Sequence, residues 1–151
     1  MATGIPPYSP PSRKPLRAAA AVIERKGEYL IGRRQANDSS GGLWEFPGGK
    51  IEPGETPKQC LERELQEELG VQARVGGLLC MVEPSERFHL TVHHAEILEG
   101  EPIMLEHDDL RWVTLHDLAS FEMLPADGPV VEKLIASVDA RSTPRPEAGD
   151  A

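Results

Sequence analysis

Residues 49–71, GKIEPGETPKQCLERELQEELGV, constrain this chain more than any other stretch. Glu64, Glu67 and Glu68 are spaced i, i+3 and i+4, so on a helix turning about 100° per residue their side chains fall within an arc of about 100°. Carboxylates this close repel one another unless a cation lies between them. Because carboxylate oxygens suit Mg²⁺ or Mn²⁺, the spacing predicts a helix face that binds a divalent cation.

The ends and the buried face of this helix are also marked in the sequence. Thr56 can act as the N-cap, Pro57 suits the first helical position, and Gly70 suits the C-terminal stop. A stripe of leucines lies beside the acids and repeats every four residues: Leu61, Leu65 and Leu69. The segment therefore predicts one helix that docks through its leucines and presents carboxylates next to them.

The same residues resemble the Nudix box. The pattern of that family is G, any five residues, E, any seven residues, R-E, an aliphatic residue, any residue, E-E, any residue, G and an aliphatic residue. Every specified position is filled here: Gly49, Glu55, Arg63, Glu64, Leu65, Glu67, Glu68, Gly70 and Val71. Residues 43–48, LWEFPG, resemble the MutT-like branch in particular, and a weaker resemblance extends over residues 17–138.

Length and charge narrow the class of protein. A chain of 151 residues suits one domain with one core, and its formal net charge of −9 argues against bulk binding to DNA or RNA. No apolar run is long enough to span a bilayer or form a secretory signal, which predicts a cytoplasmic location and no membrane contact. Cys60 and Cys80 lack metal-ligand spacing and are expected to be buried free thiols. The sequence leaves the choice between monomer and homodimer open.

Prolines and polar residues divide the chain into three parts. Residues 1–16 contain five prolines and are expected to form a disordered tail. Residues 17–139 are expected to form the folded domain. Residues 140–151 are polar and are expected to form a disordered C-terminal tail.

Apolar patterns predict the elements of the domain. Strands are expected at residues 17–24, 28–34, 71–83, 87–98 and 110–114. The first of these is alanine-rich enough to suit a helix as well, and the third is readable as one strand or two. A helical turn at 115–121 and an amphipathic helix at 129–138 follow. These elements indicate an α/β fold, and the resemblance implies the Nudix fold, an α/β/α sandwich with a mixed β-sheet between helices.

Three histidines lie within six residues of the strand expected at 87–98. His89 and His93 share one strand face with Thr91, so the two imidazoles can approach one zinc ion. Without a second cluster of His or Cys, the preferred interpretation is a wet polar face that lines the substrate groove. His94 is expected on the opposite, more apolar face.

Four residues are candidate substrate contacts. Arg34 ends a predicted strand, where the resemblance implies an arginine near the nucleotide; the alternative is a solvated strand end. Trp44 can pack in the core or stack on a base, and Phe46 is expected on the pocket floor. Asp127 occupies the position at which MutT-like proteins read the base, although it can also act as the N-cap of the last helix.

The resemblance further implies which groups hold the metal and move protons. The expected metal ligands are carboxylates and one backbone carbonyl: Glu64, Glu67, Glu68, Glu106 and the carbonyl of Gly49. Asp108 and Asp109 are alternatives to Glu106. Glu64 or Glu106 serves as the general base, a choice that the sequence leaves open. Arg63 is expected to orient a glutamate through a bidentate pair.

The activity that the resemblance implies is metal-dependent hydrolysis of a nucleoside triphosphate to a monophosphate and pyrophosphate, with Mg²⁺ as the cofactor and Mn²⁺ as an alternative. The preferred substrate is 8-oxo-dGTP, as in nucleotide-pool sanitation for DNA repair. A CTP, dCTP or 5-methyl-dCTP pyrophosphohydrolase is the alternative, because a carboxylate at Asp127 suits the donors of guanine and the amine of cytosine alike. A non-catalytic nucleotide-binding module is the alternative of another class, and the intact acids of the box argue against it.

Overall fold

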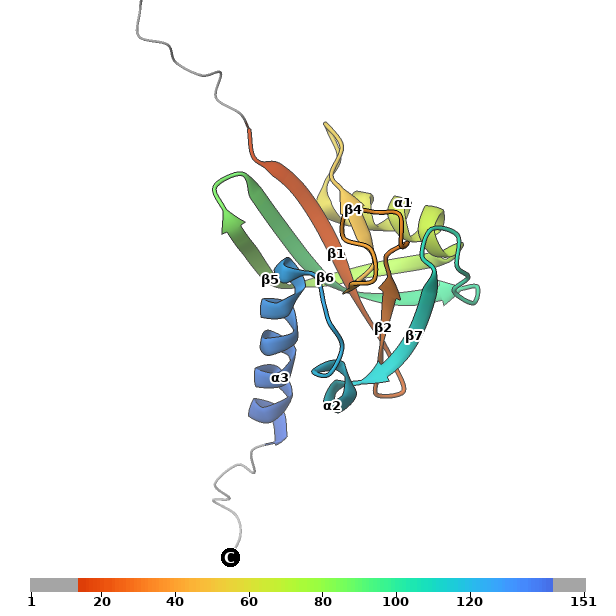
Figure 1. Ribbon diagram of the computed structural model, residues 1–151, viewed down its shortest axis with the longest axis vertical. Helices are drawn as coiled ribbons and strands as arrows, with labels where there is room; N and C mark the ends of the chain where they lie inside the picture. Colours follow the sequence, from red (N-terminus) through yellow and green to blue (C-terminus); the bar gives the residue numbers. More distant parts are fainter. Residues whose placement is uncertain (1–13, 143–151) are drawn as a thin grey trace, which may run out of the picture.

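The structure, a computed structural model, describes residues 14–142 and consists of a sheet with helices on both faces (Figure 1). The strands are β1 (Leu16–Arg25), β2 (Glu28–Arg33), β3 (Trp44–Glu45), β4 (Gly48–Lys50), β5 (Gln72–Ser85), β6 (Phe88–Glu99) and β7 (Asp109–Thr114). The helices are α1 (Pro57–Leu69), α2 (Leu115–Leu118), the short 3-10 helix η1 (Pro125–Asp127) and α3 (Gly128–Ser142). Within the described part of the chain, no helix is both long and apolar enough to cross a membrane.

Strand β1 lies at the centre of a mixed seven-stranded sheet. The strand order is β3-β2-β1-β6-β5, while β4 pairs with β1 and β7 pairs with β2. The long β1–β6 pair is parallel, and the other pairs are antiparallel. Because β4 pairs with residues 18–20 of β1, the segment that leads into α1 is fixed against the central strand.

Alternate residues of β1 enter two separate apolar cores. One core joins β1 to α1: Ala19, Ala21, Ile23, Leu61, Leu65 and Leu69. The other core joins β1 to α3: Ala20, Val22, Val130, Val131 and Leu134. The alanines of β1 thus bury small side chains on both faces of a strand, so this segment is the predicted strand rather than the alternative helix. The predicted α/β/α sandwich is confirmed (Figure 1).

Helix α1 has the ends that the sequence predicts. Thr56 Oγ1 accepts a hydrogen bond from the Gln59 N–H at 3.1 Å, and Gln59 Oε1 accepts one from the Thr56 N–H at 2.9 Å, which makes a capping box. Gly70 ends the helix at a φ of 68°, in the left-handed region that suits glycine. The N–H groups of Ile103 and Leu105 donate to carbonyls of the last turn at 3.0 and 3.3 Å. The acids of α1 therefore stand on a helix that is fixed at both ends.

Several elements differ from the sequence expectations. Strands β3 and β4 are not among the strands expected from the sequence. Strand β5 is a single strand of 14 residues with several register shifts. Helix α3 continues to Ser142, so residues 140–142 are helical rather than part of the expected C-terminal tail. The remainder of both expected tails, residues 1–13 and 143–151, lies outside the described residues.

Two neighbouring histidines of strand β6 have the reverse of the expected exposure. His93 is buried, and its Nδ1 lies 2.9 Å from the carbonyl oxygen of Gly76, so it does not belong to a wet face. The physical reason is the register shift in β5 between Val75 and Leu78, which leaves Gly76 out of the ladder beside the imidazole. His94 is exposed.

Candidate active site

Arg63 joins several acids around the start of α1. Its Nε lies 2.8 Å from Glu55 Oε2, and its Nη1 lies 2.8 Å from Glu64 Oε1 and 3.4 Å from Glu67 Oε2. The hydrogen bonds from Arg63 lower the pKa of Glu55 to about 2, and those with Glu55 and Glu64 raise the pKa of Arg63. Both oxygens of Glu55 contact the guanidinium, so the bidentate partner of Arg63 is Glu55.

The Glu64 carboxylate lies directly against the backbone of β4. A Cβ atom at Gly49 would come within 2.4 Å of Glu64 Cδ, so only glycine lets the two segments approach this closely. Burial raises the pKa of Glu64, while the neighbouring Arg63 opposes that shift. The thiol of Cys60 contacts the Gly49 carbonyl oxygen from the helix side at 3.6 Å. Gly49 and Glu64, both predicted ligands, are therefore neighbours.

Glu68 is the buried acid of α1, with 5% of its surface exposed. Its Oε2 accepts a hydrogen bond from the Gly48 N–H at 3.1 Å. Burial raises the pKa of Glu68 to about 9, and repulsion from Glu45, Glu64 and Glu106 adds to the effect. A carboxylate that burial and other carboxylates keep from ionising is stabilised in its charged form by a cation. The donor set around Glu68 consists mainly of oxygens and fits a hard divalent ion.

A second cluster, which the sequence analysis did not single out, borders Glu68. The buried Glu45 carboxylate lies 2.9 Å from His107 Nε2 and 2.8 Å from Arg34 Nη1. Arg34 also pairs with Asp38 in the loop after β2. Glu45, Glu68 and His107 each offer one possible ligand atom within 4.8 Å of the other two. The cluster connects β3, the end of β2 and the loop before β7 to the acids of α1.

One sequence signal for this cluster was available. Gly32 interrupts the bulky residues of β2, and a glycine inside a strand indicates that another group approaches closely. A Cβ atom there would lie 2.5 Å from His107 Cδ2. The glycine predicts a close approach, but the sequence does not say which group makes it.

Two adjoining cavities open beside these residues. A polar cavity of about 130 Å³ is lined by Arg34, Gln35, Asp38, Glu45, Glu68, Glu106 and His107. A more apolar cavity of about 220 Å³ has among its lining residues Phe46, Phe88, Leu90, Leu124, Ala126 and Asp127. Arg34 and Glu45 line both cavities. The arrangement suits a ligand with a highly charged end and a flat, less polar end.

Asp127 lies on the wall of the apolar cavity with 4% of its surface exposed. Its Oδ2 accepts a hydrogen bond from the Phe46 N–H at 3.3 Å, so its partner is on the cavity rather than in the first turn of α3. Burial raises the pKa of Asp127 to about 7, and repulsion from Glu45 contributes. The position predicted to read the base therefore carries a buried carboxyl group on the wall of a cavity, and the structure gives this group no helix-capping bond.

The other predicted residues fall into distinct places. Trp44 packs in the core, where its ring meets the Phe121 ring edge-on at a centroid distance of 5.1 Å. It lines neither cavity of the site. Adjacent residues of a strand point to opposite faces, and in β3 it is Glu45 that faces the cavities. The Glu67 side chain is 51% exposed and contacts Arg63. Cys60 is a buried free thiol as predicted, while the free thiol of Cys80 is only partly buried.

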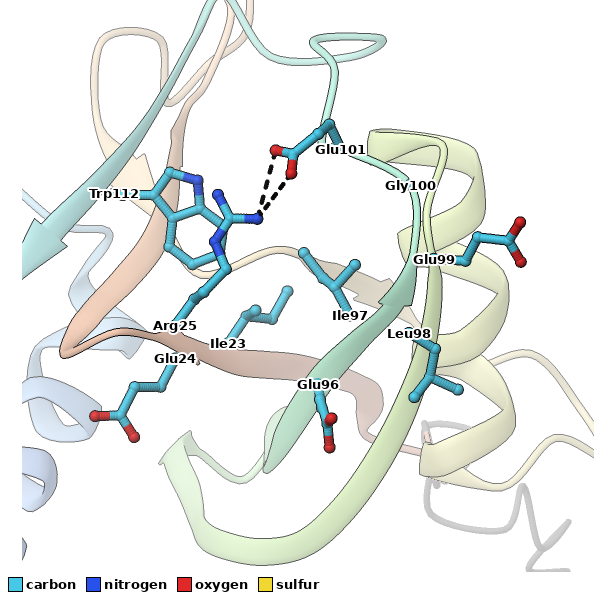
Figure 2. A pocket seen from close by; sticks show the side chains of 10 residues that line it. All are labelled: Ile23, Glu24, Arg25, Glu96, Ile97, Leu98, Glu99, Gly100, Glu101 and Trp112. Carbon is cyan, nitrogen blue, oxygen red and sulfur yellow. Dashed lines mark hydrogen bonds and ion pairs between the residues drawn. The ribbon is translucent and has the colours of Figure 1, made fainter.

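A separate cavity of about 440 Å³ lies at the other end of β1 (Figure 2). There the Arg25 guanidinium lies over the ring of Trp112 at 4.2 Å and pairs with Glu101 Oε1 at 3.1 Å. Figure 2 shows Glu24 and Glu99 pointing away from this arginine. None of the residues predicted for the site lines this cavity.

Comparison with known proteins agrees with the geometry of the acid cluster. The family model described as NUDIX domain matches residues 13–134. The chain belongs to the NUDIX family. The predicted family is therefore confirmed, and with it the prediction that the chain is a hydrolase.

Individual relatives place the chain among MutT-like members of the NUDIX family. It is 40% identical over 131 residues to CTP pyrophosphohydrolase of Escherichia coli (strain K12), covering 85% of this chain and 97% of the relative. It is 38% identical over 125 residues to 8-oxo-dGTP diphosphatase of the same strain, covering 80% and 97%. The solution structure of the E. coli ORF135 protein superposes with a TM-score of 0.74 at 36% identity, covering 87% of this chain and 96% of that chain.

Proposed function

We propose that this NUDIX protein hydrolyses nucleoside triphosphates to a monophosphate and pyrophosphate with the help of a divalent cation. The observation that carries the proposal is the buried Glu68 carboxylate, which lies among Glu45, Glu64 and Glu106 at a polar cavity that adjoins an apolar one. The names of the two E. coli relatives, a CTP pyrophosphohydrolase and an 8-oxo-dGTP diphosphatase, support this class of substrate.

The residues that would hold the cation are those around the buried acid of α1: Glu64, Glu68, Glu106 and the carbonyl of Gly49. The half-exposed Glu67 contributes from the rim. Oxygen donors favour Mg²⁺, with Mn²⁺ as the alternative. When bound, the ion supplies charge neutralisation for the phosphates and lowers the pKa of a bound water.

The arginines of the site have separate roles in this proposal. Arg34 lines both cavities and is held by Glu45 and Asp38, so its guanidinium is placed to pair with a phosphate oxygen where the two cavities meet. Arg63 lines neither cavity and instead fixes Glu55 and Glu64. Arg34 therefore binds substrate, and Arg63 orients acids.

The general base is assigned to Glu106. One oxygen of Glu64, the other candidate, is occupied by Arg63 at 2.8 Å. The described residues give the Glu106 carboxylate no hydrogen bond or ion pair, so one of its two oxygens can bind the cation while the other takes a proton from water. Glu106 is exposed, so burial does not fix the orientation of its side chain.

Asp127 is assigned to the base of the nucleotide. Its Oδ2 is bonded to the Phe46 N–H, and the remaining oxygen is free to accept from a ring N–H or an exocyclic amine. A guanine edge offers two adjacent donors and a cytosine offers its amine. Because guanine offers the larger number of donors, we rank 8-oxo-dGTP first and a cytosine triphosphate second. The observation in favour of the second candidate is the 40% identity to a relative named CTP pyrophosphohydrolase.

The test is pyrophosphate release with Mg²⁺ from 8-oxo-dGTP, dGTP, dCTP, 5-methyl-dCTP and CTP, compared as kcat/KM. A clear preference for 8-oxo-dGTP supports nucleotide-pool sanitation, and a preference for cytosine nucleotides supports the second ranking. A protein that binds these nucleotides with Mg²⁺ but releases no pyrophosphate from any of them is a binding module, and the proposal of catalysis then fails.

A further inference from the structure

Glu106 and His107 form a two-residue bridge between α1 and the sheet. On one side of the bridge, the Leu105 N–H donates to the Glu68 carbonyl oxygen at 3.3 Å. On the other side, the Asp108 N–H donates to the Arg33 carbonyl oxygen at 3.0 Å. The main chain is therefore fixed immediately before and immediately after residues 106–107. Between those points, only side chains can decide which way each of the two residues faces.

Of the two bridge residues, only His107 is anchored by its side chain. The imidazole is 3% exposed, and its Nε2 lies 2.9 Å from Glu45 Oε2. The ring is seated on Gly32, where an added Cβ would lie 2.5 Å from His107 Cδ2. The neighbouring Glu106 is exposed, lines the polar cavity beside Glu68, and has no hydrogen bond or ion pair to any described residue. Its direction therefore depends on its neighbour.

The hydrogen bond to Glu45 also fixes the form of the imidazole. A carboxylate accepts, so Nε2 carries the proton and donates to Glu45. The buried Nδ1 has no partner among the described residues. In the neutral imidazole with its proton on Nε2, Nδ1 carries a lone pair, so no buried N–H is left without a partner.

We propose that His107 is a positioning residue: by filling the space over Gly32 and donating to Glu45, it turns the Glu106 carboxylate toward Glu68. The inference rests on the proposed function, since it takes Glu68 and Glu106 to share a cation. His107 itself touches neither the cation nor the nucleotide. The competing assignment is a direct nitrogen ligand, because Glu45, Glu68 and His107 have possible ligand atoms within 4.8 Å of one another.

The experiment measures Mn²⁺ affinity by electron paramagnetic resonance for the wild type, His107→Leu and His107→Gln, each also in a Glu106→Gln background. The amide of glutamine can still donate to Glu45, whereas leucine cannot. We expect His107→Leu to weaken Mn²⁺ binding about tenfold, the lower end of the range for groups that orient metal ligands. His107→Gln should stay close to the wild type. With Glu106→Gln present, His107→Leu should weaken binding no further.

Three results overturn the positioning role. If His107→Gln binds Mn²⁺ as weakly as His107→Leu, the ring nitrogen is itself a ligand. If His107→Leu weakens binding as much in the Glu106→Gln background as in the wild type, it does not act through Glu106. If His107→Leu leaves the Mn²⁺ affinity unchanged, His107 does not orient the Glu106 carboxylate. By contrast, a wild type that binds no Mn²⁺ overturns the proposed metal-dependent function itself.

Two further variants separate positioning from a general loss of stability. His93→Leu removes another buried histidine, whose Nδ1 is bonded to the Gly76 carbonyl and which lines neither cavity of the site. It should lower the melting temperature but keep Mn²⁺ affinity; an equal loss of affinity overturns the proposal. Gly32→Ala keeps His107 but displaces its ring, and it should reproduce the weakened Mn²⁺ binding even if His107→Leu does not fold.

Discussion

Two cavities of this molecule each place an arginine beside carboxylates. In the polar cavity next to α1, Arg34 is held by Glu45 and Asp38, and Glu68 lies alongside. In the cavity of Figure 2, Arg25 is paired with Glu101. The two differ in burial: the Arg25 and Glu101 side chains are 39% and 77% exposed, whereas Glu45 and Glu68 are both buried.

This difference in burial supports the polar cavity, rather than the charged surface of Figure 2, as the proposed reaction site. An exposed ion pair is solvated and screened, and its charges are compensated without a ligand. The acids near α1 outnumber the cations within reach, and burial raises the pKa of Glu68 to about 9. The proposed cation would compensate these buried carboxylates, and this burial of uncompensated acids, rather than cavity size, favours the polar cavity as the site.

The largest expected effect tests the buried acid. Glu68→Gln should lower kcat about 1,000-fold, which corresponds to a loss of ~4 kcal/mol of charge stabilisation. It should also abolish the rise in melting temperature on adding Mg²⁺, measured by thermal unfolding with and without the ion. Glu62→Gln, an exposed acid on the same helix, is the control and should change neither quantity. Near-wild-type turnover in Glu68→Gln would remove the distinction drawn between the two cavities.

The next effect concerns the pH dependence of stability. Burial raises the pKa of Asp127 to about 7 from the ordinary 3.8. A raised folded-state pKa favours the fold at low pH, and this contribution is lost as pH rises from about 4 through 7. Asp127→Asn should therefore stabilise the protein above pH 7, by at most ~4 kcal/mol, and by much less near pH 4, measured by urea unfolding.

The same variant sharpens the assignment of the apolar cavity. If Asp127 reads the base, Asp127→Asn changes the order of kcat/KM among the five nucleotides while Mg²⁺ affinity stays constant. Glu132→Gln, exposed on α3, is the matched control for loss of one charge. An unchanged order of nucleotides would count against Asp127 as the base reader.

A smaller effect is expected at the network of Arg63. The Arg63 guanidinium lowers the pKa of Glu55 to about 2 from the ordinary 4.5. A lowered folded-state pKa stabilises the fold above about pH 4.5, and this contribution disappears as pH falls through 2. Glu55→Gln should thus lower the melting temperature at pH 7, and the difference from wild type should shrink between pH 4.5 and 2. A difference that stays constant over this range would contradict the assignment.

The smallest effect is expected at the cavity of Figure 2. Glu101→Gln removes an exposed pair and should change stability by less than about 1 kcal/mol and leave kcat/KM unchanged. Thermal unfolding and steady-state kinetics check both. A large loss of activity here would show that the two cavities are coupled.

Helix α1 was predictable because its determinants are local. The cap at Thr56, the stop at Gly70, the leucine stripe and the spacing of the acids all act within one or two turns, and each has the structure that the sequence indicated. The same locality made β1 ambiguous, because alanine suits both helix and strand. The two cores decided in favour of the strand, and they form only after the chain has folded.

The cluster around Glu45 was not predictable in the same way. Glu45 and His107 are 62 positions apart, and their hydrogen bond depends on how β2, β3 and the loop before β7 meet. For the adjacent Trp44, the sequence leaves both core packing and base stacking open, because a two-residue strand gives no pattern that shows which face the side chain takes. A buried polar pair depends on tertiary contacts. Gly32 is the sequence feature that indicates a close approach at this place.

The contacts that complete the last turn of α1 have a consequence for how this sequence can vary. Residues 103 and 105 contribute amide hydrogens there, and the side chains of residues 103–105 are all more than half exposed. Evolution or a saturation library can therefore replace these three side chains with many others, including polar ones, without altering helix α1, because the capping contacts are made by the main chain. Proline is the substitution to be excluded at 103 and 105, because it has no hydrogen to donate.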